Sequence, residues 1–224
     1  MPTCAATGAL AKHVSTSPAP VAQSLFESGA LLGATGNMHE LAFGITSNNS
    51  VTGPVRNPWN KSMIPGGSSG GVAAAVSAGM MPAGIGTDTG ASVRLPASLC
   101  GLVGFRPTVG RYSGQGIVPI SHTRDTAGPI TRSVPDAILL DRVMCSGSEE
   151  SSNTSLKGLR LGVPREYFYD DLDPDVAVAS EKVLSLLQAE GVHLVEEDIS
   201  GIGDMNNAVS FPIALYEFIS DLPK

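Results

Sequence analysis

Residues 66–71 read Gly-Gly-Ser-Ser-Gly-Gly, and residues 86–94 read Gly-Thr-Asp-Thr-Gly-Ala-Ser-Val-Arg. Both turns lie within residues 65–107, and Ser92 follows Ser68 by 24 positions. Each turn places a serine at the predicted start of a helix, where backbone N–H groups are unpaired and carry partial positive charge. Such groups can hold an anion, either a phosphate or the oxyanion of a reacting carbonyl.

Three interpretations of the two turns compete. In the plainest one they are Gly/Ser turns whose serines cap helices. A phosphate-binding loop is weaker, because the Gly-Lys-Ser/Thr of a P-loop is missing. The third is a serine hydrolase, since residues 66–70 match the pattern Gly-x-Ser-x-Gly. A nucleophile elbow, however, follows an apolar strand, and residues 57–65 do not have that character.

Apolar spacing and turn residues predict helices alternating with strands, an arrangement typical of an α/β layer. The predicted helices cover 21–34, 69–80, 92–101 and 135–145, and another begins at Asp173-Pro174 and ends near Gly191. The predicted strands cover 82–87, 159–163 and 192–195. Residues 44–68 and 104–133 read as loops, and the Ser/Glu-rich residues 147–155 read as a linker or surface loop.

Composition excludes several classes of protein. The chain has 224 residues, 42% of them hydrophobic, and a net charge of −7, which argues against general binding to nucleic acid or an anionic membrane. Residues 1–148 carry +3 and residues 149–224 carry −10, so the second segment is expected to have an acidic surface. Three cysteines without a CxxC pair, and no secretory or transmembrane pattern, favour reduced thiols and a cytoplasmic location.

Residues 65–107 resemble the amidase signature family of serine amidases. The resemblance extends over nearly the whole chain through residues 36–49, 55–60, 123–128, 167–173 and 215–218. It implies an α/β fold in which helices flank a twisted mixed sheet. We expect residues 1–224 to form a partial domain of this kind, with the segment that carries the catalytic lysine and the C-terminal half missing.

The resemblance also implies the roles of individual residues. Ser92 matches the nucleophile, and Ser68 matches a bridging serine whose peptide bond is cis. The backbone N–H groups of Thr89, Gly90, Ala91 and Ser92 match the oxyanion hole. A neutral lysine would draw the proton of Ser92 through Ser68. None of the five lysines falls in the family's lysine motif, so this chain is expected to lack its base; they are Lys12, Lys61, Lys157, Lys182 and Lys224.

Further polar residues near the turns allow two interpretations each. Asp88 and Arg94 are expected to form a buried ion pair with Ser69 that stiffens both turns; the alternative is a surface pair worth about 0–1 kcal/mol. Four arginines between residues 106 and 132 face one acid, Asp125, and favour a solvated face over an anion site. A triad of Ser with His122 and Asp125 is disfavoured, because the family uses no histidine.

The implied reaction is hydrolysis of a linear amide. The resemblance is strongest to auxin-forming members and implies conversion of indole-3-acetamide to indole-3-acetate and ammonia, with water as co-substrate and no cofactor or metal. Another amide hydrolase of the family, or the amidase subunit of a tRNA-dependent amidotransferase, is the alternative among enzymes. A truncated remnant without catalysis, or one that only binds a ligand, is the alternative of another class. Assembly into a homo-oligomer stays open.

Overall fold

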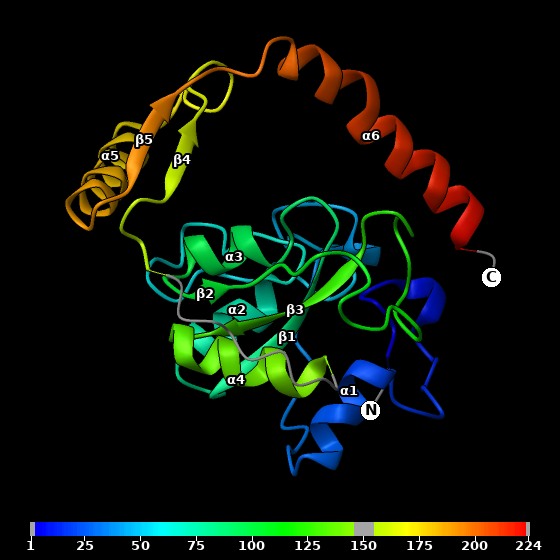
Figure 1. Cartoon of the computed structure of the whole chain (residues 1–224). Coiled ribbons are helices and arrows are strands. Elements are labelled where there is room, and N and C mark those ends of the chain that lie inside the picture. Colours follow the sequence, from blue (N-terminus) through cyan, green and yellow to red (C-terminus); the bar gives the residue numbers. More distant parts are fainter. Residues whose placement is uncertain (1–2, 146–154, 223–224) are drawn as a thin grey trace. The chain divides into compact units, whose positions relative to one another are not determined.

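A computed structural model describes residues 3–145 and 155–222 (Figure 1). The chain divides into two compact units. Unit 1 comprises Met1–Glu149 and Ala214–Lys224, and unit 2 comprises Glu150–Ile213. The boundary falls within the predicted linker 147–155, of which all but the last residue lies outside the described residues.

A three-stranded antiparallel sheet forms the centre of unit 1. Its order is β1 (Ala83–Asp88), β3 (Thr126–Thr131), β2 (Val103–Gly104). All six residues of β3 are buried, as expected of a central strand with packing on both faces. The pairing of Asp88 with Thr126 brings the end of β1 beside the start of β3, which places the loops at these two points next to each other.

Helices cover this sheet. Helix α2 packs on β1 and β3, α3 on β2, and α4 on β3, while α1 packs on α4. One core cluster joins α2, α3 and β3 through Ala73, Val93, Ala97, Cys100 and Ile130. The helices are α1 (Pro20–Glu27), α2 (Gly70–Ser77), α3 (Arg94–Leu99) and α4 (Val134–Met144), with short 3₁₀ turns at Gly8–Leu10 and Glu40–Ala42.

Unit 2 contains a parallel strand pair and a long helix. β4 (Arg160–Val163) pairs with β5 (His193–Glu196), and α5 (Pro174–Ala189) connects them along the chain. Asp173 caps α5 by accepting a hydrogen bond from the Asp175 amide, as the Asp-Pro start predicts. Helix α6 (Ile202–Asp221) follows, and its residues from Ala214 onward belong to unit 1.

The predicted alternation of helices and strands is confirmed, with corrections at several boundaries. The helix expected over 21–34 ends at Glu27, because Gly29 adopts φ +90° and stops it. The helix expected over 69–80 ends at Ser77, before Gly79 at φ +72°. Strand β3 lies inside the predicted loop 104–133, and α6 was not predicted.

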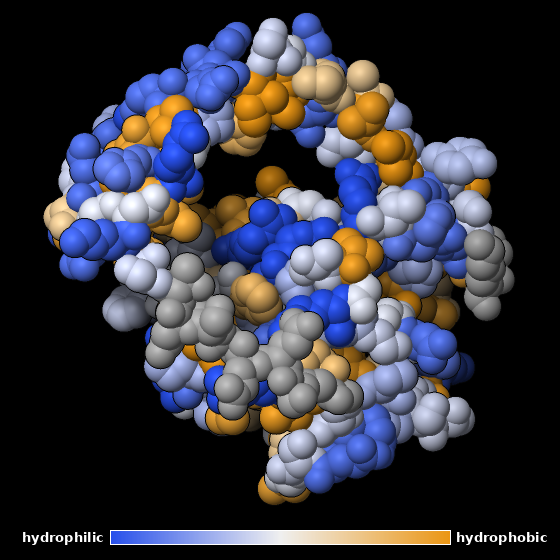
Figure 2. Space-filling model, viewed as in Figure 1, coloured by the Kyte–Doolittle hydropathy of each residue, from blue (hydrophilic) through white to orange (hydrophobic). Residues whose placement is uncertain are grey.

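Among the described residues, no helix is long and apolar enough to cross a membrane. Figure 2 shows apolar side chains at the surface along α6. Val209 is 50% exposed and Ile219 is 74% exposed. These residues lie on a helix whose apolar character the sequence pattern did not resolve into one buried face.

Candidate active site

The two glycine-flanked turns lie against each other. The Ser69 amide donates to the Ser92 carbonyl oxygen at 3.3 Å. Ser68 is completely buried and Ser92 is 8% exposed. Helix α2 begins at Gly70 and α3 at Arg94, so each serine stands just before a helix start. The juxtaposition inferred from the sequence is therefore present in the fold.

The turn that carries Ser68 is held from both sides by Ser47. The Ser47 hydroxyl donates to the Ser68 carbonyl oxygen at 3.2 Å and accepts from the Gly70 amide at 3.1 Å. The His39 amide also donates to the Ser68 carbonyl oxygen, at 3.1 Å. The Gly67–Ser68 peptide bond is cis, which confirms that expectation. The sequence analysis did not single out Ser47.

The Ser68 hydroxyl has no hydrogen-bond partner within residues 3–145 and 155–222, although it is buried. Leaving a buried hydroxyl unpaired costs about 1–3 kcal/mol. Such an unsatisfied group is characteristic of a reactive centre that awaits a further partner.

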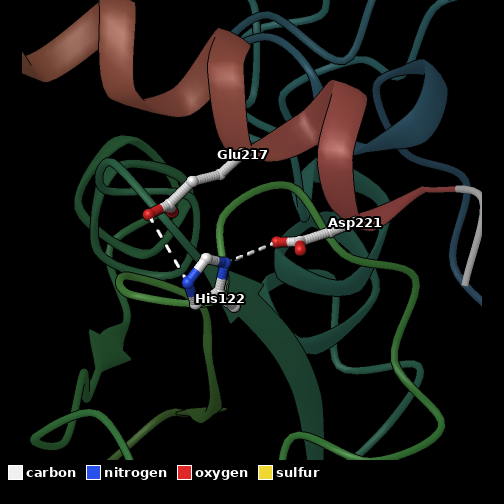
Figure 3. A group of neighbouring side chains, drawn as sticks. All are labelled: His122, Glu217 and Asp221. Atoms are coloured by element: carbon white, nitrogen blue, oxygen red, sulfur yellow. Dashed lines mark hydrogen bonds and ion pairs between the residues drawn. The ribbon is translucent and has the colours of Figure 1, made fainter.

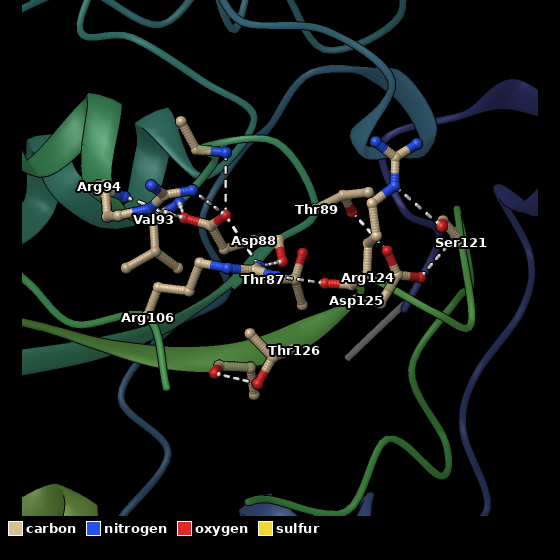
Figure 4. Close-up of polar contacts among 12 residues, drawn as sticks. Thr87, Asp88, Thr89, Val93, Arg94, Arg106, Ser121, Arg124, Asp125 and Thr126 are labelled. Atoms are coloured by element: carbon tan, nitrogen blue, oxygen red, sulfur yellow. Dashed lines mark hydrogen bonds and ion pairs between the residues drawn. The ribbon is translucent and has the colours of Figure 1, made fainter. Parts of the chain in front are cut away.

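The turn that carries Ser92 is organised by Asp88 (Figure 4). This carboxylate is completely buried and accepts from the amides of Ala91 at 2.9 Å, Val93 at 3.1 Å and Arg94 at 3.3 Å. Burial raises the pKa of the Asp88 carboxyl, but hydrogen bonds from Arg94 and from the Ala91 and Val93 amides outweigh burial and hold this pKa below its ordinary value of 3.8. Asp88 is therefore a stable carboxylate that fixes the turn.

Two arginines complete the surroundings of Asp88. Arg94 binds it with both Nε, at 3.1 Å, and Nη2, at 3.0 Å. The side chain of Arg94 is 50% exposed, so the expected buried pair is buried on the aspartate side only. Arg106 donates from Nη1 to Oδ1 at 3.0 Å and also to the Asp88 carbonyl oxygen. The sequence analysis did not assign this role to Arg106.

Ser69 does not join the ion pair, contrary to expectation. Its hydroxyl donates to the Thr87 carbonyl oxygen at 3.4 Å and accepts from the Thr87 amide at 3.3 Å. It can do so because a Cβ at Gly86 would lie 2.5 Å from this hydroxyl, and glycine leaves that space open. Ser69 thus links the first turn to β1 and acts on the backbone, not on the charged side chains.

One of the four expected oxyanion donors is already engaged. The Ala91 amide donates to Asp88, because this buried carboxylate needs donors from the turn. The amides of Thr89, Gly90 and Ser92 make no hydrogen bond in the described part of the chain. A Cβ at Gly90 would meet no atom within 4 Å, so the space in front of this residue is open. The donors that remain are Thr89, Gly90 and Ser92.

The arginines of residues 106–132 do not line a solvated face, which corrects that expectation. Arg111 forms a two-point pair with Asp141, at 2.7 Å for both contacts. Arg124 donates to the Ser121 hydroxyl at 3.3 Å, and Arg132 donates to the Met81 carbonyl oxygen at 2.9 Å. Each guanidinium therefore tethers two segments of unit 1.

His122 lies between two buried carboxylates at the end of α6 (Figure 3). Its Nδ1 is 2.8 Å from Asp221, and its Nε2 is 3.7 Å from Glu217. The three side chains have the residue types of a metal site, but the two ring nitrogens face different carboxylates and do not converge on one point. His122 is paired with Asp221 and Glu217, so it forms no triad with Asp125.

Two cavities of unit 1 lie away from the serines. One of about 220 Å³ is lined by Thr46, Asn48, Pro54, Val55, Arg56 and Ile64. The other, of about 520 Å³, is lined by Ile117, Pro119, His122, Asp221 and Leu222. Ser68 and Ser92 line neither, so hydrogen-bond geometry, not cavity size, locates the candidate active site.

The arrangement of two serines, free main-chain donors and a buried acid at one point is that of a serine-dependent acyl-transfer centre. The amidase family model matches residues 1–224, and the chain belongs to this family. The amidase-type component of the Thermotoga maritima glutamyl-tRNA(Gln) amidotransferase has a similar fold, with a TM-score of 0.91 and 36% identity over 98% of this chain and 51% of that one. The peptide amidase of Stenotrophomonas maltophilia is also similar, with a TM-score of 0.84 and 30% identity over 98% of this chain and 49% of that one.

Individual enzymes of known name are more similar in sequence. The indoleacetamide hydrolase of Rhizobium radiobacter is 60% identical over 97% of this chain and 46% of its own length. The mandelamide hydrolase of Pseudomonas putida is 46% identical over 97% of this chain and 44% of its own length. The chain thus spans about half the length of the curated relatives it matches.

Proposed function

We propose that this protein hydrolyses linear amides, with indole-3-acetamide as substrate and indole-3-acetate and ammonia as products. The observation that carries the proposal is the hydrogen bond between the Ser69 amide and the Ser92 carbonyl. It holds the two turns together next to the buried, unpartnered hydroxyl of Ser68. The 60% identity to the Rhizobium radiobacter enzyme supports the choice of substrate.

In this mechanism the Ser92 hydroxyl oxygen attacks the amide carbonyl carbon. Its proton passes to the Ser68 oxygen, which in turn gives its own proton to a neutral lysine. The amides of Thr89, Gly90 and Ser92 stabilise the negative charge on the carbonyl oxygen. The C–N bond then breaks, and the nitrogen takes a proton and leaves as ammonia.

The second half of the reaction regenerates the enzyme. Water attacks the acyl ester on Ser92, loses a proton to the same base, and releases the carboxylic acid. We propose that the lysine comes from outside residues 1–224, because none of the five lysines here matches the family's lysine motif. The unpaired Ser68 hydroxyl is the group to which it would bind.

A chimaera tests the proposal. This chain replaces the matching stretch of the Rhizobium radiobacter enzyme, and ammonia release is measured with indole-3-acetamide. We expect turnover that falls by at least about 10⁴-fold in Ser92→Ala, as for removal of a serine nucleophile. Ser98→Ala is the matched control, because this exposed serine lies on the same helix, α3.

Mass spectrometry after treatment with a fluorophosphonate identifies the nucleophile. We expect the adduct on Ser92. An adduct that persists in Ser92→Ala but disappears when another serine is replaced would refute the assignment. A second substrate, mandelamide, is compared in the same assay, because a mandelamide hydrolase is 46% identical. Preference for mandelamide would retain the amide hydrolysis and overturn the indole substrate.

A further inference from the structure

The side chain of Thr89 connects the oxyanion turn to a distant loop (Figure 4). Its hydroxyl donates to Asp125 Oδ1 at 2.5 Å. Thr89 directly follows β1, and Asp125 directly precedes β3. The two residues are 36 positions apart, and the pairing of Asp88 with Thr126 brings them together.

The second oxygen of Asp125 holds the loop before β3. Asp125 Oδ2 accepts from the amide of Ile120 at 2.7 Å and from the amide of Ser121 at 2.8 Å. Asp125 therefore receives three donors and couples Thr89 to residues 120–121. Charge-assisted hydrogen bonds of this kind are about twice as strong as neutral ones.

This loop is in turn bound to the last turns of α6. The hydroxyls of Ser121 and Thr123 both donate to the Glu217 carboxylate. Burial raises the pKa of Glu217, but the hydrogen bonds from these two residues bring it below its ordinary value of 4.5. Glu217 is thus a charged anchor for the loop, and all of these contacts lie within unit 1.

The turn between Asp88 and Ser92 is held unequally. Its later part is fixed, because Asp88 binds the amides of Ala91, Val93 and Arg94. The amides of Thr89 and Gly90 have no such hold within the described residues, and the region in front of Gly90 is open. For these two residues, the Thr89 hydroxyl is the contact that determines where their amides point.

We propose that Asp125 is a positioning residue that holds Thr89, and through it the first two oxyanion donors, in the orientation that catalysis requires. The proposal rests on the proposed function, since it assigns these amides to an oxyanion. A displacement of about 1 Å in an active site costs on the order of 10²-fold in rate. Loss of this brace should therefore act on the rate and leave substrate binding nearly unchanged.

The first test uses the 224-residue chain and needs no turnover. ¹⁵N relaxation measures the order parameter of the Gly90 amide in Thr89→Val, in Thr89→Ser and in Asp125→Asn. We expect about 0.85 in the wild type and in Thr89→Ser, which keeps the hydroxyl, and below about 0.6 in the other two variants. Thr108→Val, at an exposed loop position, is the matched control and should leave the value unchanged.

Hydrogen exchange of the Ile120 and Ser121 amides is the second measurement. We expect it to accelerate at least about tenfold in Asp125→Asn, since an amide nitrogen cannot accept in place of Oδ2. If Gly90 stays rigid in both Thr89→Val and Asp125→Asn, the proposal is wrong. If neither variant folds while Thr89→Ser does, the contact maintains the fold and does not position the turn, which also overturns the proposal.

Kinetics of the chimaera separate this proposal from the proposed function. We expect Thr89→Val to lower kcat about 10- to 100-fold with KM within about twofold, and Thr89→Ser to restore kcat. Full kcat in Thr89→Val, with activity abolished by Ser92→Ala, would reject the positioning role and leave the hydrolase intact. An inactive wild-type chimaera would instead count against the hydrolase, while the relaxation measurement still decides the positioning role.

Discussion

At the scale of single residues, Asp88 determines the geometry around Ser92. Its carboxylate is completely buried and is surrounded by three backbone amides and by the guanidinium groups of Arg94 and Arg106. A buried charge is tolerated only with such partners. Because three of its five partners are amides of the turn itself, the charge shapes the backbone directly.

We predict that Asp88→Asn lowers the free energy of unfolding by about 2–3 kcal/mol, because it breaks a charged network of which one member is half exposed. The folded-state pKa of Asp88 lies below the ordinary 3.8. Its stabilisation is therefore fully present above that ordinary value and is lost as the pH falls through the lower folded-state pKa. Urea denaturation at pH 7 and at pH values below 3.8 measures this.

The wild type should lose the advantage over Asp88→Asn on acidification, so that the two stability curves converge. A difference between them that stays constant from neutral pH to the acid limit would show that the carboxylate charge is not what stabilises the turn.

At the scale of elements, the start of α2 depends on a close fit with the loop before it. A Cβ at Gly70 would lie 2.3 Å from the Ser47 hydroxyl, which is too short for any contact. The hydroxyl needs that place because it binds both the Gly70 amide and the Ser68 carbonyl. The helix can therefore begin here only with glycine at this position.

We predict that Gly70→Ala destabilises unit 1 by about 1–3 kcal/mol through overpacking. Thermal denaturation of the chain measures the change. In the background of Ser47→Gly, the same substitution should cost clearly less, since the clashing hydroxyl is gone. Ser47 has φ +52°, a conformation that glycine adopts without strain. Equal costs in both backgrounds would show that the clash is not the cause.

At the scale of the whole molecule, the described residues bring together the two serines and the main-chain donors. They supply no partner for the Ser68 hydroxyl. A serine without a general base is a weak nucleophile at neutral pH. The chain spans about half the length of the curated relatives, which locates the proposed base outside the sequence at hand.

We predict that the 224-residue chain alone releases no ammonia from indole-3-acetamide above the rate of its own Ser92→Ala variant. The reason is the missing proton acceptor at Ser68. The ammonia assay used for the chimaera measures this, with the wild-type chimaera as the positive control. Sustained turnover by the isolated chain would mean that another group serves as the base, and the mechanism would need revision.

The local sequence allowed much of the fold to be predicted. The Asp-Pro start of α5 was correct because a cap and its helix are neighbours in the chain. The helix over 21–34 was predicted too long, since apolar spacing continues past Glu27 while Gly29 ends the helix. Strand β3 escaped prediction because it is buried on both faces and contains glycine and proline, so it shows no alternation.

The sequence by itself determined the family and the two serines, because a turn's character depends on a few adjacent small residues. Only the tertiary structure decided what holds these turns. The hydroxyl contacts of Ser47 with Ser68, Thr89 with Asp125, and Ser121 with Glu217 span 21, 36 and 96 positions. A hydrogen bond between such distant residues leaves no periodic pattern in either segment, so its partners become known only when the strands and helices are placed.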